Sequence, residues 1–363
     1  MKNTQKLMIL TLLIVAMMTA CSSKKTTDNQ PAATNQPKAT DSQTEVTQEP
    51  SEATQAPTEA VSASATIRIA SLKGPTTMGM VKLMSDSNAG TTKNQYKVTM
   101  HGTPDEIVTQ IVKGDIDVAC VPCNLASVLY NKTKGGIRVA AINTLGVLYV
   151  VENGTTVQSV EDLKGKTIYS TGKGTSPEYV LNYVLSMNGI DPAKDVTIEY
   201  KSEATEVAAL LANDDSAIAM LPQPFVTIVS AKNKNLRVAL DMSAEWNKIQ
   251  GEGEGGSDCV TGVVVVRNEF LDQNKEVFNE FLNDYLASTQ YVNSDVAGAA
   301  VLIGEYDIVP EAIAKAAIPK CNITFVEGED MKTKISGYLK VLFDQNPEAV
   351  GGKLPDDAFY YER

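Results

Sequence analysis

Few residues in this chain have the side chains and the spacing that catalysis requires. His101 is the only histidine, and no serine or cysteine elbow pattern accompanies it. A nucleophile paired with a base therefore does not emerge. Asp115 and Asp117 stand at the entry to an expected strand, where carboxylates are commonly solvated. We expect no catalytic set, no enzyme activity and no cofactor.

Two of the cysteines have the spacing of a metal or redox site. Cys120 and Cys123 are separated by two residues, but no second such pair and no further histidine completes a zinc set. Cys120 also ends an apolar run, where a small buried thiol is ordinary. We therefore expect no metal. A disulfide between Cys259 and Cys321 is one alternative outside the cell, and two free thiols are the other.

The loop 172–178 (GKGTSPE) has the composition of a site for an anion or a carbonyl oxygen. Its glycines allow the backbone to approach a ligand closely. Thr175 or Ser176 can cap the helix that follows, and Pro177 suits its first turn. Free amides at a positive helix end bind oxygens without Lys or Arg. We predict ligand contacts from Thr175 and Ser176; a connection that only caps itself is the alternative.

The loop 73–77 (KGPTT) repeats this logic, although it lacks the Gly-Lys-Ser/Thr ending of a phosphate-binding P-loop. We predict contacts from Thr76 and Thr77, with a self-capped turn as the alternative. Asn124 follows the third expected strand and either exchanges hydrogen bonds with a ligand or caps a helix. All these loops follow strands, and ligands in open α/β sheets bind at the carboxyl ends of strands.

Three more residues are candidates for ligand contact. Gln223 and Phe225 flank a proline and offer an amide and an aromatic face, although Phe225 also suits a core. Trp246, the only tryptophan, lies in a stretch that we interpret as irregular, just before the glycine-rich segment 251–256. It either stacks on the ligand or anchors a hinge.

Strand and helix patterns alternate along the body of the chain, which predicts parallel sheets with helical crossovers. The run 138–151 is apolar and nearly unbroken, which fits a strand that passes from one lobe to another. Residues 259–266 can return the chain, and the pattern from 274 onward is mainly helical. We predict an α/β fold with two lobes and a cleft between them: residues 65–154 and 258–363 form the first lobe, and 155–257 the second.

The N-terminus reads as an export signal. A basic start is followed by the apolar run 7–18, which is shorter than the roughly 20 residues of a membrane-spanning helix, so we interpret 1–20 as a signal peptide. Residues 18–21 (MTAC) resemble a bacterial lipobox, which would make Cys21 the lipidated N-terminus; an ordinary secretory signal is the alternative. The polar, Pro-containing segment 21–64 reads as a disordered linker. The formal net charge of −12 argues against a nucleic-acid partner or attraction to anionic lipid.

Several segments of the body resemble the extracytoplasmic solute-binding proteins of the sulfonate/nitrate/taurine and thiamine-precursor type. They are 162–168 (DLKGKTI) with the glycine loop after it, 114–119 (GDIDVA), and the corner 221–225 (LPQPF), where this group often has Glu in place of Gln223. Their order and spacing cover most of 65–363. The resemblance implies a periplasmic-binding-protein-like fold of type II, in which each lobe holds a parallel-rich sheet flanked by helices.

The same resemblance implies capture of a small polar or anionic organic solute for the permease and ATPase of an ABC importer. We expect a monomer outside the cytoplasm, held to the bacterial membrane through a lipid anchor alone. A surface sensor or adhesin on the same scaffold is the alternative function, and a pyrimidine-synthase-like enzyme is a more remote one. The genes beside this one would separate import from sensing.

Overall fold

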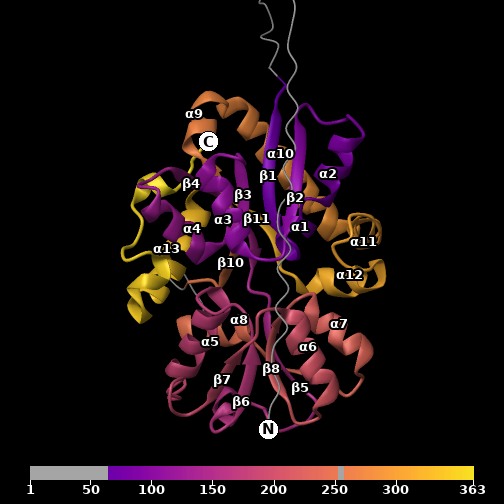
Figure 1. Ribbon diagram of the computed structural model, residues 1–363, viewed down its shortest axis with the longest axis vertical. Helices are drawn as coiled ribbons and strands as arrows, with labels where there is room; N and C mark the ends of the chain where they lie inside the picture. The colour runs from indigo at the N-terminus through magenta and orange to yellow at the C-terminus, as the bar shows by residue number, and fades with distance from the viewer. Residues whose placement is uncertain (1–63, 252–256) are drawn as a thin grey trace, which may run out of the picture. The chain divides into compact units, whose positions relative to one another are not determined.

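The computed structural model describes residues 64–251 and 257–363, within the compact unit Ala60–Arg363. The predicted signal peptide, Cys21 and the predicted linker up to residue 63 lie outside the described residues. Two separate sheets, each flanked by helices, give this unit the two lobes that the sequence predicts (Figure 1). Within the described segments, no helix has the length and apolar character needed to cross a membrane.

The first lobe contains a six-stranded mixed sheet. Strands that are joined by helices pair in parallel, whereas the strand that returns from the second lobe runs antiparallel to both of its neighbours. In their order across the sheet, the strands are β11 (Ile323–Val326), β4 (Ile137–Leu145), β10 (Val260–Arg267), β3 (Val118–Pro122), β1 (Thr66–Leu72) and β2 (Gln95–His101).

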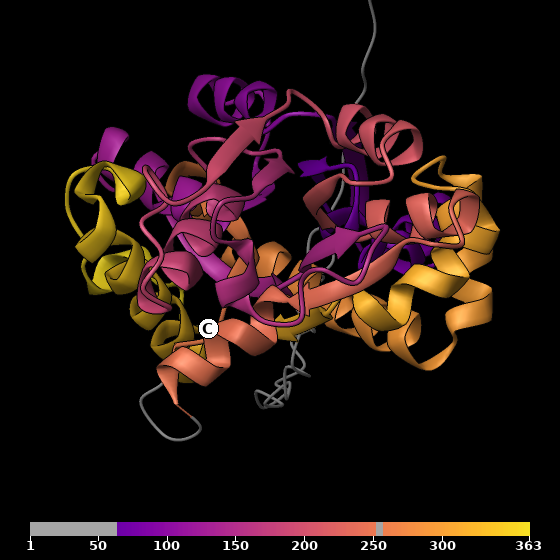
Figure 2. The same cartoon turned by 90° about the horizontal axis from the view of Figure 1, so that it is seen from below.

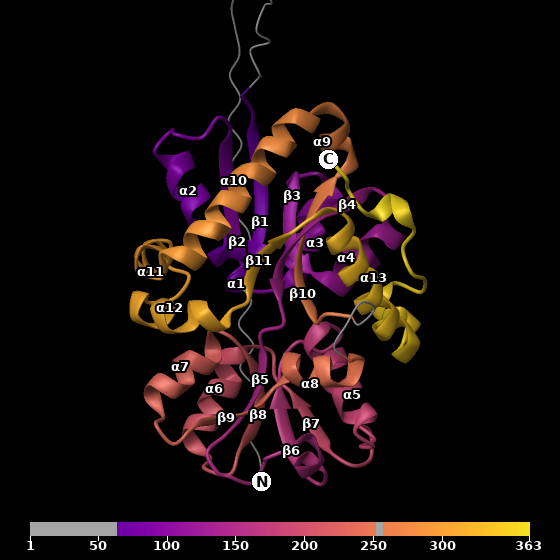
Figure 3. The same ribbon diagram turned by 180° about the vertical axis from the view of Figure 1, so that it is seen from behind.

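Helices cover both faces of this sheet. The long helix α10 (Lys275–Ser294) runs diagonally across one face (Figure 3) and packs Phe278, Phe281 and Tyr285 against the strands. Helices α3 (Pro104–Lys113), α4 (Cys123–Lys132) and α13 (Gly328–Gln345) cover the other face. The remaining helices and short 3-10 turns of this lobe are α1 (Pro75–Met78), α2 (Val81–Asn88), α9 (Asn268–Gln273), α11 (Val296–Glu305), α12 (Glu311–Ala317), η2 (Ile318–Lys320), η3 (Pro347–Val350) and η4 (Asp357–Phe359).

The second lobe has a five-stranded mixed sheet in the order β7 (Thr197–Tyr200), β6 (Thr167–Ser170), β8 (Ile218–Pro222), β5 (Leu148–Glu152) and β9 (Arg237–Asp241). Its helices lie on both faces, as the view from below also shows (Figure 2). The core on one face involves α5 (Ser176–Met187) and α8 (Met242–Gln250). The core on the other face involves α6 (Ala204–Asn213) and α7 (Phe225–Lys232). A 3-10 turn, η1 (Val160–Leu163), precedes β6.

The boundary between the lobes differs from the sequence prediction. The apolar run 138–151 is two strands, because the chain leaves the first sheet after Leu145 and enters the second at Leu148. Strand β5, which we expected in the first lobe, therefore belongs to the second. Apolar composition could not reveal this break, since both strands are buried along most of their length. The sheets are also less parallel than expected, because each holds strands that run antiparallel to their neighbours.

Three local expectations also need correction. The helix predicted from Met78 divides into α1 and α2 around Gly79, whose Cα lies so close to α10 and β11 that a Cβ would approach Ile323 Cγ2 to 3.1 Å. Strand β11 lies in a region predicted to be mainly helical. Trp246, expected in an irregular stretch, is on α8, whose first turn is capped by the carboxylate of Asp241.

All four cysteines of the described body are buried, and none is in a disulfide. The alternative of a Cys259–Cys321 bridge is thus not realised here. Burial raises the pKa of Cys120 and Cys259 to about 12, which keeps both thiols protonated at neutral pH. In the part of the chain that the structure describes, no group of three His, Cys, Asp or Glu side chains is placed to hold a metal ion.

Glu152, at the end of β5, ties the second sheet to the loop that follows. Its buried carboxylate accepts hydrogen bonds from the backbone N–H groups of Thr156 (3.2 Å) and Val157 (3.0 Å), and it pairs with the guanidinium of Arg237. Burial raises the pKa of Glu152, but these hydrogen bonds outweigh burial and hold it below its usual range.

We predict that Glu152→Gln lowers the free energy of unfolding by about 2 kcal/mol at neutral pH. Because the folded-state pKa of Glu152 is depressed, its contribution is present above the unfolded-state pKa and is lost as the pH falls through the folded-state value. The difference between variant and wild type should therefore shrink in acid. Urea unfolding at several pH values measures it, with the exposed Glu206→Gln as the control. A difference that does not vary with pH would contradict this role.

Candidate ligand-binding site

The carboxyl ends of the parallel strands in both sheets face the junction between the lobes. In the first sheet, Pro122 at the end of β3 pairs with Gly262 near the start of β10, where the chain has just returned from the second lobe. In the second sheet, Pro222 at the end of β8 pairs with Leu148, where the chain has just arrived. The loops chosen from the sequence all follow strands that end at these two edges.

In the first lobe, the threonines of the 73–77 loop point back into their own turn. Thr76 Oγ1 donates to the carbonyl of Leu72 at 2.8 Å, and Thr77 Oγ1 lies 2.6 Å from the same oxygen. Both residues are buried, and Tyr285 from α10 donates to the carbonyl of Thr76 at 3.2 Å. These hydrogen bonds match the self-capped turn that was the alternative. Each hydroxyl oxygen can still accept a further hydrogen bond, so Thr76 and Thr77 stay predicted ligand contacts.

Asn124 and Ser176 meet across the two lobes. Ser176 Oγ, at the first residue of α5, lies 3.4 Å from Asn124 Oδ1 near the start of α4. The amide of Asn124 lies 3.5 Å from the carbonyl of Gly174 and donates to the carbonyl of Ala349 at 3.1 Å. Both side chains are at most 2% exposed. The structure thus brings these two predicted residues together from loops that are far apart in the sequence.

Thr175 occupies the N-cap position of α5, with a proline in the first turn, as the sequence predicted. Its hydroxyl does not cap the helix but donates to the carbonyl of Gly172 at 2.7 Å. Gly172 and Gly174 both have positive φ, 75° and 77°, so the loop requires glycine at these positions. In this conformation the carbonyl oxygen of Gly174 lies 3.5 Å from Asn124 Nδ2.

Gln223 lies at the second-lobe edge and is 1% exposed. Its Oε1 accepts from Thr227 Oγ1 at 2.8 Å, while its Nε2 is buried without a partner. Its backbone N–H donates to the carbonyl of Val147, in the segment that links the lobes, at 2.9 Å. Phe225 is half-buried and packs against the second-lobe core around α6 and α7, which corresponds to its core alternative.

Trp246 is fully buried at the other connection between the lobes. Its ring centroid lies 4.6 Å from that of Tyr183 on α5 and 5.4 Å from that of Tyr338 on α13 of the first lobe. Its Nε1–H donates to the carbonyl of Ser257 at 2.6 Å. With its ring packed against two tyrosines and its N–H bonded, Trp246 fits the hinge alternative better than stacking on a ligand.

Sequence reasoning missed a set of polar residues near the linking segment 146–147. They share one property: each has a buried side-chain atom without a hydrogen-bond partner among the described residues. Such atoms are costly to bury and are expected to find partners. Asn143 and Thr144 come directly before the crossing at 146–147, and this position is the signal that could have found these two once the break in 138–151 is known. The whole set is Asn143, Thr144, Ser243 and Thr261, in addition to Gln223.

Most groups of this site are uncharged, but the carboxylate of Glu178 accepts a hydrogen bond from the N–H of Gly174 at 2.5 Å. The lysines of the two candidate loops, Lys73 and Lys173, are exposed, and Lys73 pairs with the exposed Asp307 at 3.3 Å. Burial raises the pKa of Tyr338, beside Ser176, well above its usual value, so its hydroxyl stays protonated. His101 lies at the end of β2 and contacts Glu106 at 2.7 Å, as expected of a polar residue at a strand end. The arrangement can bind the oxygen atoms and N–H groups of a ligand through hydrogen bonds from uncharged side chains.

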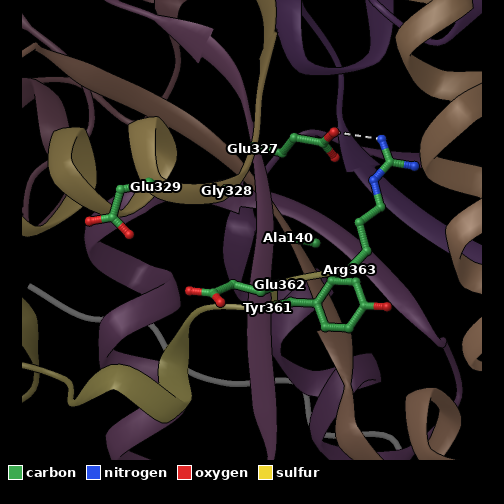
Figure 4. Close-up of a pocket in the computed structure, with 7 residues that line it drawn as sticks. All are labelled: Ala140, Glu327, Gly328, Glu329, Tyr361, Glu362 and Arg363. Carbon is green, nitrogen blue, oxygen red and sulfur yellow. Dashed lines mark hydrogen bonds and ion pairs between the residues drawn. The ribbon is translucent and has the colours of Figure 1, made fainter.

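A separate surface pocket of about 330 Å³ lies on the first lobe, where β11 and the C-terminal residues approach β4 (Figure 4). Arg363 pairs with Glu327 at 2.6 Å there, and Ala140 forms its floor. Ala140 lies in the middle of β4, away from the end that meets the second lobe. The pocket therefore does not belong to the site between the lobes.

Residues 89–252 match the family described as the periplasmic substrate-binding protein of the phosphonate ABC transporter. YtlA of Bacillus subtilis (strain 168), provisionally named a binding protein, is 22% identical over 198 residues, which are 53% of this chain. The match spans 55% of the length of that relative.

Solved structures show the fold. An ABC transporter protein from Parabacteroides distasonis has a TM-score of 0.66 at 23% identity, covering 82% of this chain and 99% of that one. The aliphatic sulphonate binding protein SsuA of Escherichia coli has a TM-score of 0.64 at 14% identity, covering 82% and 92%. The two-lobed fold predicted from the sequence is thereby confirmed, and the match over residues 89–252 agrees with the resemblance to ABC-transporter substrate-binding proteins.

We predict that Gly262→Ala destabilises the protein by about 1–3 kcal/mol. A Cβ at this position would lie 2.6 Å from Asn143 Oδ1 and 2.9 Å from Thr76 Cγ2, so the site would have to rearrange. Gly102→Ala is the matched control, because a Cβ there meets nothing within 4 Å. Chemical denaturation of both variants measures the difference. Equal stabilities would contradict the close packing described for this edge.

Proposed function

We propose that this protein captures a small polar or anionic organic solute outside the cytoplasm and delivers it to the permease of an ABC importer. The observation that supports this most is the placement of unpartnered, buried amides on both sides of the linking segment. Asn143 stands on the first-lobe side and Gln223 on the second-lobe side. A solute bound between the lobes would give these groups partners and so favour the closed arrangement.

The site is proposed to bind and not to catalyse. Its side chains are mainly amides and hydroxyls, and the lone histidine is engaged with Glu106 and Thr99 at a strand end. Thr76, Thr77, Asn124, Thr175, Ser176 and Gln223 remain proposed contacts, whereas Phe225 and Trp246 are more easily explained by packing. We propose that the protein acts as a monomer whose partners are the solute, the permease and the ATPase.

A thermal-shift screen of sulfonates, phosphonates, carboxylates and pyrimidines tests the binding function. A ligand that binds only the folded state stabilises it by about 2.7 kcal/mol at 100 times its Kd, so a true ligand should raise the melting temperature clearly. Ser176→Ala should reduce the shift, because it removes the hydroxyl that meets Asn124. Ser216→Ala, whose hydroxyl bonds Asp214 on the surface, is the control. Absence of any shift across the panel at millimolar concentration would contradict capture of such a solute.

The membrane anchor is a separate proposal, based on residues 18–21 and on the resemblance to a lipobox. A single acyl chain gives only marginal membrane binding, whereas two or more hold a protein firmly. We predict that Cys21→Ala moves the protein from the membrane fraction to the soluble fraction, measured by fractionation and by labelling with a fatty acid. Ser23→Ala should stay membrane-bound. Membrane retention of Cys21→Ala would exclude lipidation at this cysteine.

A further inference from the structure

The two lobes contact each other on both sides of the linking segment 146–147. On one side, α12 of the first lobe lies against α7 of the second (Figure 1, Figure 3). On the other side, α13 lies against α5, and there the ring of Tyr338 packs against that of Trp246. All these contacts are made by atoms of the chain itself, so they are available whether or not a solute is bound.

One hydrogen bond joins the lobes on the side of α7 and α12. Tyr149 on β5 of the second lobe donates its hydroxyl to the carbonyl of Lys320, at the end of η2 in the first lobe, at 3.1 Å. Tyr149 is 9% exposed. Separation of the lobes would exchange this bond for bonds to water, so it favours the closed arrangement by the modest net amount of one neutral hydrogen bond.

The donor of this bond is held firmly in the second lobe. Tyr149 pairs with Leu221 on β8 and with Asp241 on β9, and its side chain packs in the core that involves α6 and α7. Burial raises the pKa of Tyr149 to about 12, so its hydroxyl keeps its proton and remains a donor at neutral pH. The hydroxyl therefore moves with the second lobe.

The acceptor is held in the first lobe. Asn322, two residues after Lys320, has a φ of 43°, in the left-handed region that asparagine enters more readily than most residues. Its carbonyl accepts from the N–H of Leu145, the last residue of β4, at 3.1 Å, and its side-chain amide donates to the carbonyl of Gly146. The carbonyl of Lys320 therefore keeps its place beside the end of β4 when the second lobe moves.

The contacts on the two sides respond differently to a rotation of one lobe against the other. The packing of Trp246 between Tyr183 and Tyr338 is apolar and has little directional requirement, so a small rotation preserves most of it. A hydrogen bond weakens steeply when its atoms move apart or out of line. The bond from Tyr149 is therefore lost early in opening, whereas the contact of Trp246 persists.

Resting on the proposed function, we propose that the hydrogen bond from Tyr149 to Lys320 is a latch, which holds the lobes closed in the solute-free protein and must break before a solute can enter. Trp246 stays packed between the lobes while the latch breaks. Because the latch involves only atoms of the chain, it favours the closed form equally with and without a solute. It therefore sets how often the site opens and not which solute the site holds.

Pulsed electron paramagnetic resonance between two spin labels tests the latch without any solute. Asp105→Cys and Glu206→Cys place the labels on exposed residues in the first turns of α3 and α6, one in each lobe, in the full chain carrying Cys21→Ala. The remaining cysteines are buried and are therefore poor targets for the label. With Tyr149 present, one short distance should dominate. Tyr149→Phe should raise the ratio of long to short distances about fivefold, as expected for the loss of one neutral hydrogen bond.

Tyr306→Phe is the matched control, because its hydroxyl accepts from Asn88 at 3.0 Å and both residues belong to the first lobe. This variant should leave the distances unchanged. Tyr149→Leu also removes the hydroxyl and keeps an apolar side chain in the core, so it keeps the test valid if the phenylalanine variant does not fold. A protein with Tyr149 that is found mainly at the long distance, or Tyr149 variants with unchanged distances, would overturn the latch.

The outcomes separate this inference from the proposed function. If the Tyr149 variants leave the distances unchanged but a solute of the panel raises the melting temperature, the latch is wrong while solute capture stands. If the variants shift the distances but no solute of the panel binds, the hydrogen bond does hold the lobes closed and the proposed function fails.

Discussion

The site depends on one constraint, which is that the chain passes between the two sheets twice. Each passage leaves one sheet and enters the other at the edge where the parallel strands end. Loops that follow strands in either lobe are therefore directed toward the other lobe. The first passage is held on both sides, because Asn322 of the first lobe contacts the carbonyl of Gly146 while Gln223 of the second bonds Val147.

The two passages differ in chemistry. At the second, Trp246 packs between tyrosines of both lobes, and its N–H is satisfied by Ser257. At the first, Asn143 and Gln223 carry buried donors without partners. The second passage thus supplies an apolar contact whose polar group is satisfied, whereas the first leaves buried polar atoms without partners among the described residues.

Local patterns in the sequence were enough to predict much of this arrangement. The glycines and proline of the 172–178 loop predicted a tight strand-to-helix turn, and the structure has positive φ at Gly172 and Gly174. The alternation of strands and helices predicted two α/β lobes. These features depend on residues close together in the chain, where turn and capping preferences act.

The features that could not be predicted depend on contacts between distant segments. Nothing within β4 distinguishes Asn143 from an ordinary strand residue. Its side chain fits where it does because Gly262, far along the chain, has no Cβ, and a Cβ there would lie 2.6 Å from Asn143 Oδ1. The division of 138–151 into β4 and β5 is likewise decided by which partners each half finds, Gly262 for one and Pro222 for the other. A buried neutral amide leaves little trace in composition, because its significance depends on whether the folded chain supplies it with hydrogen-bond partners. Asn143 is therefore recognised from the atoms that the folded chain leaves without partners, and not from any pattern in the sequence.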